Sequence, residues 1–160
     1  MGLGIELSAP DAEALAPFGQ FLTAPEQPGV RNFYSEVLRE HGPQSAPVLH
    51  VNHVPETKLP VQITQVERHP FAAQCFIPLD VERYAVVVMP STRDGHPCIA
   101  KALALLVPGT MGVTYKANVW HVGATVFDRA GHFAVLMCRD GTDRDDEFRE
   151  IPPLVLSLKN

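Results

Sequence analysis

Residues 84–89 read Tyr-Ala-Val-Val-Val-Met, an unbroken apolar run with the length of a single β-strand. A short run of this kind, rich in β-branched residues, is typical of a strand that is buried on both faces. Turn-forming residues precede it at Asp80 to Arg83. The stretch therefore predicts a buried strand inside a β-rich fold.

Short β-like runs continue on both sides of this strand. Residues 61–69 alternate, with Val61 and Ile63 on one face and Gln62 and Thr64 on the other. Residues 100–107 are compatible with a strand or a short helix. Further strands are predicted at residues 48–54, 74–78, 113–115, 125–127, 133–138 and 154–158. About eight to ten strands at this regular spacing predict an all-β sandwich or barrel with little helix.

The chain has the length of one domain, so we expect a single domain over residues 1–160. Residues 9–18 are the one clear candidate helix, with Ser8 or Asp11 as its N-cap. We therefore expect residues 1–47 to form a helix-and-loop extension to the strands. Gly141 to Glu150, which reads GTDRDDEFRE, is expected to be a solvated connecting loop.

Composition excludes several classes of function. Apolar residues make up 46% of the chain and charged residues 19%, which is ordinary for a globular protein. The net charge is −5 and no basic stripe is present, so a nucleic-acid partner is not expected. No apolar run reaches the roughly 18 residues of a membrane helix, and the N-terminus lacks the pattern of a secretory signal. The odd count of three cysteines argues against a disulfide framework, so we expect a cytoplasmic protein.

A first group of polar residues lies at Glu67-Arg68-His69-Pro70, followed by Gln74. On a strand, Glu67 and His69 are two residues apart and leave the same face. A carboxylate and an imidazole on the inner face of a barrel can hold a divalent metal or act as an acid–base pair. The alternative is an ordinary surface ion pair between Glu67 and Arg68, with His69 solvated. Spacing alone favours this alternative.

A second group spans residues 115–121, which read Tyr-Lys-Ala-Asn-Val-Trp-His and include the only tryptophan of the chain. Hydrogen-bonding and aromatic groups at this density, just after a Pro-Gly turn, are typical of a loop that contacts a ligand. The alternative is a core tryptophan with polar neighbours at the start of a strand. The residues themselves do not decide between these two interpretations.

Taken together, the two groups resemble the ureidoglycolate lyase family. The resemblance covers the central half of the chain and is carried by matching segments at residues 59–60, 67–70, 74–78, 112–115, 118–121 and 151–152. The ERHP and NVWH pieces are fairly specific in combination. The chain departs from the family pattern at Lys116, Ala117 and Val122.

The resemblance implies a cupin-type antiparallel β-barrel, also called a double-stranded β-helix. Glu67-x-His69, followed by Gln74, fits the spacing of the first cupin motif, and His121 is the counterpart of the histidine in the second. The resemblance thus implies that Glu67, His69, Gln74 and His121 point into one barrel and hold a divalent metal such as Ni, Zn or Mn. It also implies a homodimer, for which the region before Val48 is the expected interface.

The family reaction converts ureidoglycolate, an intermediate of purine and allantoin degradation, to glyoxylate and urea. It moves no electrons to a cofactor, so no redox cofactor is expected. The resemblance implies that Glu67 or His69 is the base or holds the metal, and that His121 is the acid or a further ligand. The expected substrate-binding residues are Gln74, Phe76, Tyr115, Lys116, Asn118 and Trp120, with Lys116, Asn118 or Tyr115 on the carboxylate.

Two alternatives remain open at this point. The departures at Lys116, Ala117 and Val122 favour a cupin lyase or isomerase that acts on another small carboxylate. A non-catalytic domain that binds a small molecule is the second alternative. The absence of a helix-turn-helix or another second domain argues against it, and we rank an enzyme higher because the polar residues gather in two compact segments.

Overall fold

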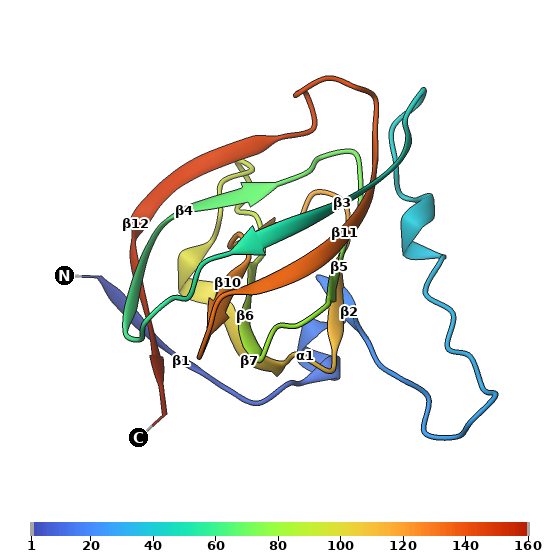
Figure 1. Ribbon diagram of the computed structural model, residues 1–160. Helices are drawn as coiled ribbons and strands as arrows, with labels where there is room; N and C mark the ends of the chain where they lie inside the picture. The colour runs from blue at the N-terminus through green and yellow to red at the C-terminus, as the bar shows by residue number, and fades with distance from the viewer. Residues whose placement is uncertain (1, 160) are drawn as a thin grey trace.

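The computed structural model describes residues 2–159, and its strands form two curled sheets (Figure 1). The larger sheet has the order β1-β12-β4-β9-β6-β10, and β7 also pairs with β6. Its strands are β1 (Leu3–Leu7), β4 (Val61–Arg68), β6 (Arg83–Met89), β7 (Leu103–Pro108), β9 (Trp120–His121), β10 (Thr125–Phe127) and β12 (Glu147–Leu158). All pairings in this sheet are antiparallel except that of β1 with β12.

The smaller sheet has five strands in the order β2-β8-β5-β11-β3 and is entirely antiparallel. Its strands are β2 (Gly19–Leu22), β3 (Ala46–Val54), β5 (Gln74–Pro78), β8 (Gly112–Tyr115) and β11 (Gly131–Arg139). Both sheets contribute apolar side chains to one core that lies between them. This core contains Leu15, Phe21, Phe76, Val81, Tyr84, Val86, Val88, Leu105, Val107, Val113, Tyr115, Val126, Phe133 and Val135. The arrangement is the expected cupin-type barrel.

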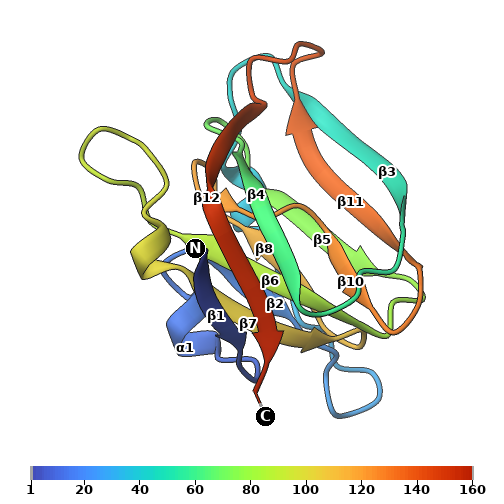
Figure 2. The same ribbon diagram turned by 90° about the vertical axis from the view of Figure 1, so that its left-hand side faces the viewer.

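A second core fills the concave space of the larger sheet. The backbone N–H of Ser8 donates to Ala104 O, and Leu106 N–H donates to Ser8 O, so the sheet curls until β1 meets β7 (Figure 2). The second core contains Leu7, Val66, Ala85, Val87, Met89, Ala104, Trp120, Val122, Phe127, Ile151, Leu154 and Leu156. The chain therefore has two apolar cores that share the strands of the larger sheet.

Strand β6 separates the two cores. Tyr84, Val86 and Val88 pack into the core between the sheets, while Ala85, Val87 and Met89 pack into the second core. Successive side chains of a strand point to opposite faces, so an unbroken apolar run is required where both faces are covered. The predicted buried strand at residues 84–89 is confirmed.

The N-terminal region differs from the expected helix and loop. Helix α1 covers only Ala12–Leu15, with the Asp11 side chain accepting a hydrogen bond from Ala14 N–H at 2.9 Å as its N-cap. Strands β1 and β2 flank it, and each pairs with a strand from the later part of the chain. These long-range pairings form two strands outside the predicted helix, where no strand was expected, and they make the first 22 residues part of both sheets. After a short 3₁₀ turn at Val37–Arg39, the chain enters β3.

The charged C-terminal segment also differs from expectation. Only residues 140–146 form a loop, because β12 begins at Glu147 and pairs with β4 over Glu147–Glu150. A bulge between Glu150 and Leu154 then accommodates Ile151-Pro152-Pro153. No helix in the described part of the chain is long and apolar enough to cross a membrane.

The close packing of β2 against β8 predicts the effect of one small substitution. A Cβ atom on Gly19 would lie 1.9 Å from the carbonyl oxygen of Thr114, a backbone atom that has no room to retreat. We expect Gly19→Ala to lower the free energy of unfolding by about 1–3 kcal/mol or more, measured by chemical denaturation. Gly4→Ala in β1, where a Cβ would meet nothing within 4 Å, is the matched control. Equal stability of the two variants would contradict the packing of β2.

Candidate metal centre

Three side chains that can bind a metal converge on the face of the larger sheet that is directed toward the smaller sheet. Glu67 and His69 come from β4 and its end, and His121 comes from β9. Each offers one ligand atom, and these atoms all lie within 4.8 Å of one another. His121 is directly opposite Glu67 in the pairing of β9 with β4, so their side chains leave the same face of the sheet.

The surroundings of the two imidazoles fix which nitrogen carries the proton. His69 Nδ1 lies 2.8 Å from the carbonyl oxygen of Asp145, and His121 Nδ1 lies 2.9 Å from that of Val119. A carbonyl oxygen only accepts a hydrogen bond, so each Nδ1 must carry the proton. In the neutral ring, Nε2 then presents a lone pair, which is the form that ligates a metal.

These Nε2 atoms have no hydrogen-bond partner among the described residues, although both are buried. His121 Nε2 lies 3.4 Å from Glu67 Oε1, but the two do not form an aligned hydrogen bond. Gln74 Oε1 is a third buried acceptor without a partner, while its Nε2 contacts Met137 Sδ at 3.8 Å. Buried polar atoms are rarely left unsatisfied. Two imidazole nitrogens with carboxylate and amide oxygens are a donor set that suits a divalent transition metal.

Glu67 is the member of the triad that solvent reaches. Its side chain is 20% exposed, whereas His69 is 6% exposed and His121 only 1%. Burial tends to raise the pKa of the Glu67 carboxyl, but its contact with His121 and the positive charge that both histidines carry when they are protonated outweigh burial and lower that pKa. Glu67 is therefore a carboxylate at neutral pH.

Tyr115 packs against the His121 side of the triad. Its ring stacks on His121 with 4.4 Å between the ring centroids and an interplanar angle of 21°. Burial, followed by the negative charge of Glu67, raises the pKa of Tyr115. The ring therefore stays neutral and gives the buried imidazole an apolar, polarizable support.

A family model described as Ureidoglycolate lyase matches residues 4–154 of the chain. The chain belongs to the ureidoglycolate lyase family. This agrees with the resemblance carried by the ERHP and NVWH segments.

Two similar members of the ureidoglycolate lyase family illustrate the relationship. The chain is 30% identical over 139 residues to a ureidoglycolate lyase of Schizosaccharomyces pombe, and this alignment covers 84% of this chain and 67% of the relative. It is 32% identical over 117 residues to that of Escherichia coli K12, which covers 73% of this chain and 71% of the relative. Among solved structures, RmlC from Streptococcus suis in complex with dTDP-D-xylose aligns with a TM-score of 0.47 and 10% identity, over 87% of this chain and 73% of that chain.

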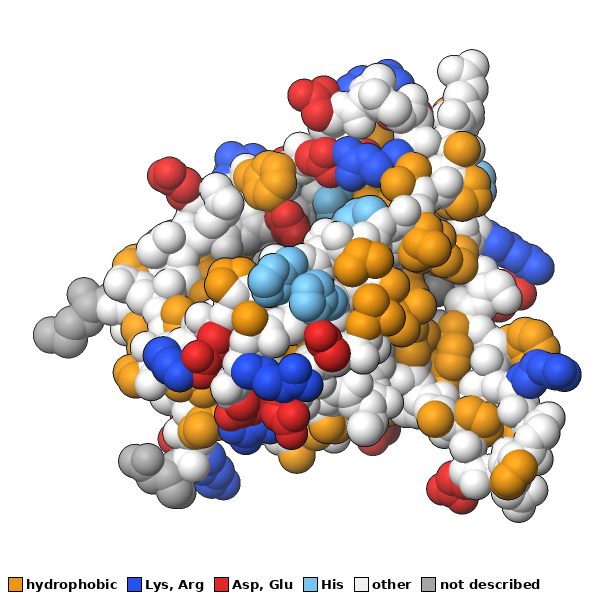
Figure 3. Space-filling view, in the orientation of Figure 1, with side chains coloured by type: hydrophobic (Ala, Val, Ile, Leu, Met, Phe, Trp, Pro, Cys, Tyr) orange, Lys and Arg blue, Asp and Glu red, His pale blue; other side chains and the backbone are white. Residues whose placement is uncertain are grey.

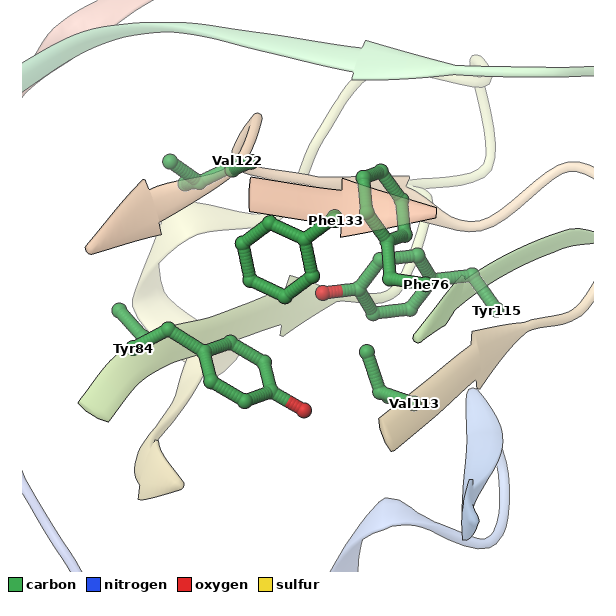
Figure 4. A pocket seen from close by; sticks show the side chains of 8 residues that line it. Phe76, Tyr84, Val113, Tyr115, Val122 and Phe133 are labelled. Carbon is green, nitrogen blue, oxygen red and sulfur yellow. The ribbon is translucent and has the colours of Figure 1, made fainter. Parts of the chain in front are cut away.

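Phe76 and Tyr115 also line a small cavity in the core between the sheets (Figure 4). The cavity has a volume of about 10 Å³, which is room for about one water molecule. Edge-to-face contacts join Phe76 to Tyr115 and to Phe133. The core around Phe76 and Tyr115 is therefore closely packed, and this cavity is too small for a substrate.

Trp120, which was expected to contact the substrate, does not join the triad. Side-chain alternation along β9 sends Trp120 into the second core and His121 into the first. The indole Nε1–H donates to Gly95 O at 3.1 Å, and the Arg68 guanidinium lies 4.3 Å from the ring centroid. Arg68 itself pairs with Glu147 rather than with Glu67. The surface ion pair considered for Glu67 is therefore absent.

The structure also leaves Lys116 outside the triad. Lys116 Nζ donates to the carbonyl oxygen of Ala16 at 2.7 Å, beside an open groove that none of the three triad residues lines. Asn118 is exposed and has a φ of 66°. Its contribution is the backbone N–H, which donates to the carbonyl oxygen of His69 at 2.7 Å. This bond ties the turn before β9 to the end of β4.

The residues 139–146 contribute to the site and were missed by the sequence pattern. Asp145 supplies the carbonyl that binds His69 Nδ1, and Asp146 Oδ1 lies 3.2 Å from the same nitrogen. Arg139 pairs with Asp146, and this hydrogen bond lowers the pKa of the Asp146 carboxyl. Burial raises the pKa of Asp145. The only sequence signal was the density of charge in GTDRDDEFRE, which is equally typical of a solvated loop.

The unpaired Nε2 atoms predict a measurable metal affinity. We expect isothermal titration of the metal-free protein with Zn²⁺, Ni²⁺ or Mn²⁺ to show one tight site per chain. His69→Ala or His121→Ala should weaken it by more than the roughly 10–100-fold that loss of a supporting partner costs. His96→Ala, which removes an exposed histidine in the loop after β6, is the matched control. Unchanged affinity in either triad variant would contradict the assignment.

Proposed function

We propose that this member of the ureidoglycolate lyase family cleaves ureidoglycolate to glyoxylate and urea, as a carbon–nitrogen lyase of purine and allantoin degradation. The observation that carries the proposal is the triad of Glu67, His69 and His121, in which two buried Nε2 lone pairs face one accessible carboxylate. Family membership supplies the reaction, and the names of the relatives in yeast and bacteria support it.

The reaction breaks one carbon–nitrogen bond and moves one proton. The hydroxyl of ureidoglycolate loses its proton, the oxygen electrons form the carbonyl of glyoxylate, and the carbon–nitrogen pair leaves with the ureido nitrogen. That nitrogen takes a proton to become urea. Protons and electrons balance without an oxidant or reductant, so a single base that returns its proton to the leaving group is sufficient.

Glu67 suits the role of this base, because it is ionised at neutral pH and is the exposed member of the triad. It accepts the hydroxyl proton and returns it to the ureido nitrogen as the bond breaks. His69 and His121 present the donor atoms that would hold a divalent ion with Glu67. Gln74 is the proposed fourth ligand, because its Oε1 is buried without a hydrogen-bond partner. Such an ion, when bound, lowers the pKa of the substrate hydroxyl.

The apolar floor of the site has a separate task. Tyr115 stacks on His121 and Phe76 packs against Tyr115, and the cavity beside them has room for only about one water molecule, so little water approaches the triad from that side. Charges interact more strongly where water is excluded. The floor therefore strengthens the attraction between the site and the charge that develops on the substrate oxygen.

We expect the purified protein to release urea and glyoxylate in equal amounts from ureidoglycolate. Glu67→Gln keeps the shape of the side chain but removes the base, so kcat should fall by about 10²–10⁴-fold. The measurement is urea release, with glyoxylate determined in the same samples. Glu6→Gln, an exposed carboxylate on β1, controls for loss of charge. A metal-loaded wild-type protein without urea release would refute the proposed reaction.

We also propose that two copies associate through β3 rather than through the whole region before Val48. β3 is the last strand of the smaller sheet, so one of its edges has no partner strand among the described residues. Its nine residues carry no charge, although the chain as a whole is acidic. Leu49 is 68% exposed and Val51 60% exposed, and Figure 3 shows hydrophobic side chains gathered on this side. An uncharged edge strand pairs readily with its own copy.

Val51→Lys should shift this association toward the monomer. In a symmetric antiparallel pair of β3 strands, the two lysines introduce like charges into a small interface. Light scattering coupled to gel filtration should give the mass of two chains for the wild type and of one chain for the variant. Leu3→Lys on β1 is the control, because Leu3 is a similarly exposed apolar residue on the other sheet. A monomeric wild type would overturn this proposal.

A further inference from the structure

The loop between β11 and β12, residues 140–146, closes over the barrel beside His69. It carries two adjacent acidic residues, and one of them, Asp145, is only 7% exposed. An aspartate is seldom buried unless its carboxylate is bound. The burial of Asp145 therefore indicates a specific structural role at this position.

The two carboxylates of the loop bind in different directions. Asp145 Oδ1 accepts a hydrogen bond from Phe71 N–H at 2.6 Å, just beyond the end of β4. Asp146 accepts two hydrogen bonds from the Arg139 guanidinium at the end of β11, one of them at 3.0 Å. The loop is thereby attached to both sheets at once, since β4 and β11 belong to different sheets.

This attachment brings two acceptors to one nitrogen of the triad. His69 Nδ1 lies 2.8 Å from the carbonyl oxygen of Asp145 and 3.2 Å from Asp146 Oδ1. The carbonyl oxygen of Asp145 accepts a hydrogen bond from Nδ1–H, and the nearby Asp146 carboxylate can also only accept while it is ionised. Asp146 remains ionised because it is paired with Arg139.

We infer that Asp145 and Asp146 form a clamp that holds His69 with its proton on Nδ1 and its Nε2 lone pair directed at the triad. Arg139 acts through Asp146 by fixing the orientation of its carboxylate. All three are positioning residues. The Asp145 backbone carbonyl and the Asp146 carboxylate contact His69 Nδ1, while the Asp145 side chain holds Phe71 N–H. His121 needs no such clamp, since its Nδ1 is bound by Val119 O within its own strand connection.

Two consequences follow, and only the second rests on the proposed function. The tautomer of His69 depends on the clamp whether or not a metal binds. If the triad holds a divalent ion, the clamp also raises the affinity for that ion, because an imidazole fixed by a partner on its other nitrogen is a stronger ligand.

The first experiment observes the tautomer directly. Long-range ¹H–¹⁵N NMR spectra of the metal-free full-length protein at about pH 8, where an ordinary histidine is neutral, distinguish a protonated Nδ1 from a protonated Nε2. We expect His69 to carry its proton on Nδ1 in the wild type. The double variant Asp145→Ala/Asp146→Ala should show a mixture of both tautomers, while His121 stays unchanged as an internal reference.

The second experiment measures Zn²⁺ affinity by competition with a chromophoric chelator. Asp146→Ala should weaken binding by about 10–100-fold, and Arg139→Gln should weaken it in the same direction. Because Arg139 acts through Asp146, the double variant Arg139→Gln/Asp146→Ala should lose no more Zn²⁺ affinity than Asp146→Ala alone. Asp143→Ala is the matched control, as it removes an exposed carboxylate from the same loop.

The outcomes separate the clamp from simpler effects. Equal losses in Asp143→Ala and Asp146→Ala would overturn the clamp in favour of a general charge effect. An unchanged His69 tautomer in the Asp145→Ala/Asp146→Ala variant would overturn the clamp as well. Asp145→Asn and Asp146→Asn, which keep the shape and an acceptor oxygen, should retain the tautomer if the alanine variants unfold. A wild type that holds the Nδ1 tautomer but binds no metal supports the clamp and refutes the proposed metal centre.

Discussion

The alternation of side chains across β4 and β9 separates the chemistry of this protein from its packing. On β9, Trp120 points into the core of the curled larger sheet, while His121 points into the space between the two sheets. On β4, Val66 points to the first of these sides and Glu67 to the second. A shift of one residue in β4 would bury the Glu67 carboxylate among aliphatic side chains, and a shift of one residue in β9 would turn Trp120 out of its core. The triad therefore depends on the same register that fills both cores.

Much of the central fold is readable from local sequence, because period and composition there agree with the final structure. The apolar run at residues 84–89 predicted a strand with both faces buried, and β6 is buried on both faces. The common face of Glu67 and His69 follows from the two-residue period. By contrast, β1 and β2 are stabilised by partners more than 90 residues away, such as Leu154 and Tyr115. Propensity in a short window carries no information about such partners, so no strand was expected there.

Only part of the site could be predicted by the same reasoning. Residue types and spacing indicated which side chains could bind a metal. They did not indicate the direction of backbone carbonyl groups, although the carbonyls of Asp145 and Val119 determine which imidazole nitrogen faces the triad. The role of Trp120 was also undecidable from a seven-residue segment, because a ligand-contacting indole and a core indole have the same neighbours in sequence. Only the pairing of β9 with both β4 and β6 distinguishes them.

The packing of Tyr115 against His121 has a stereochemical consequence. The ring of Tyr115 stacks on one face of His121, so the surroundings of the triad differ from one side to the other. The reacting carbon of ureidoglycolate carries four different groups and is therefore a stereocentre. When its hydroxyl faces Glu67, the two mirror-image forms place their carboxylate and ureido groups in exchanged positions against the same asymmetric rim. A site with such asymmetric surroundings is intrinsically handed, because the two enantiomers make different contacts within it.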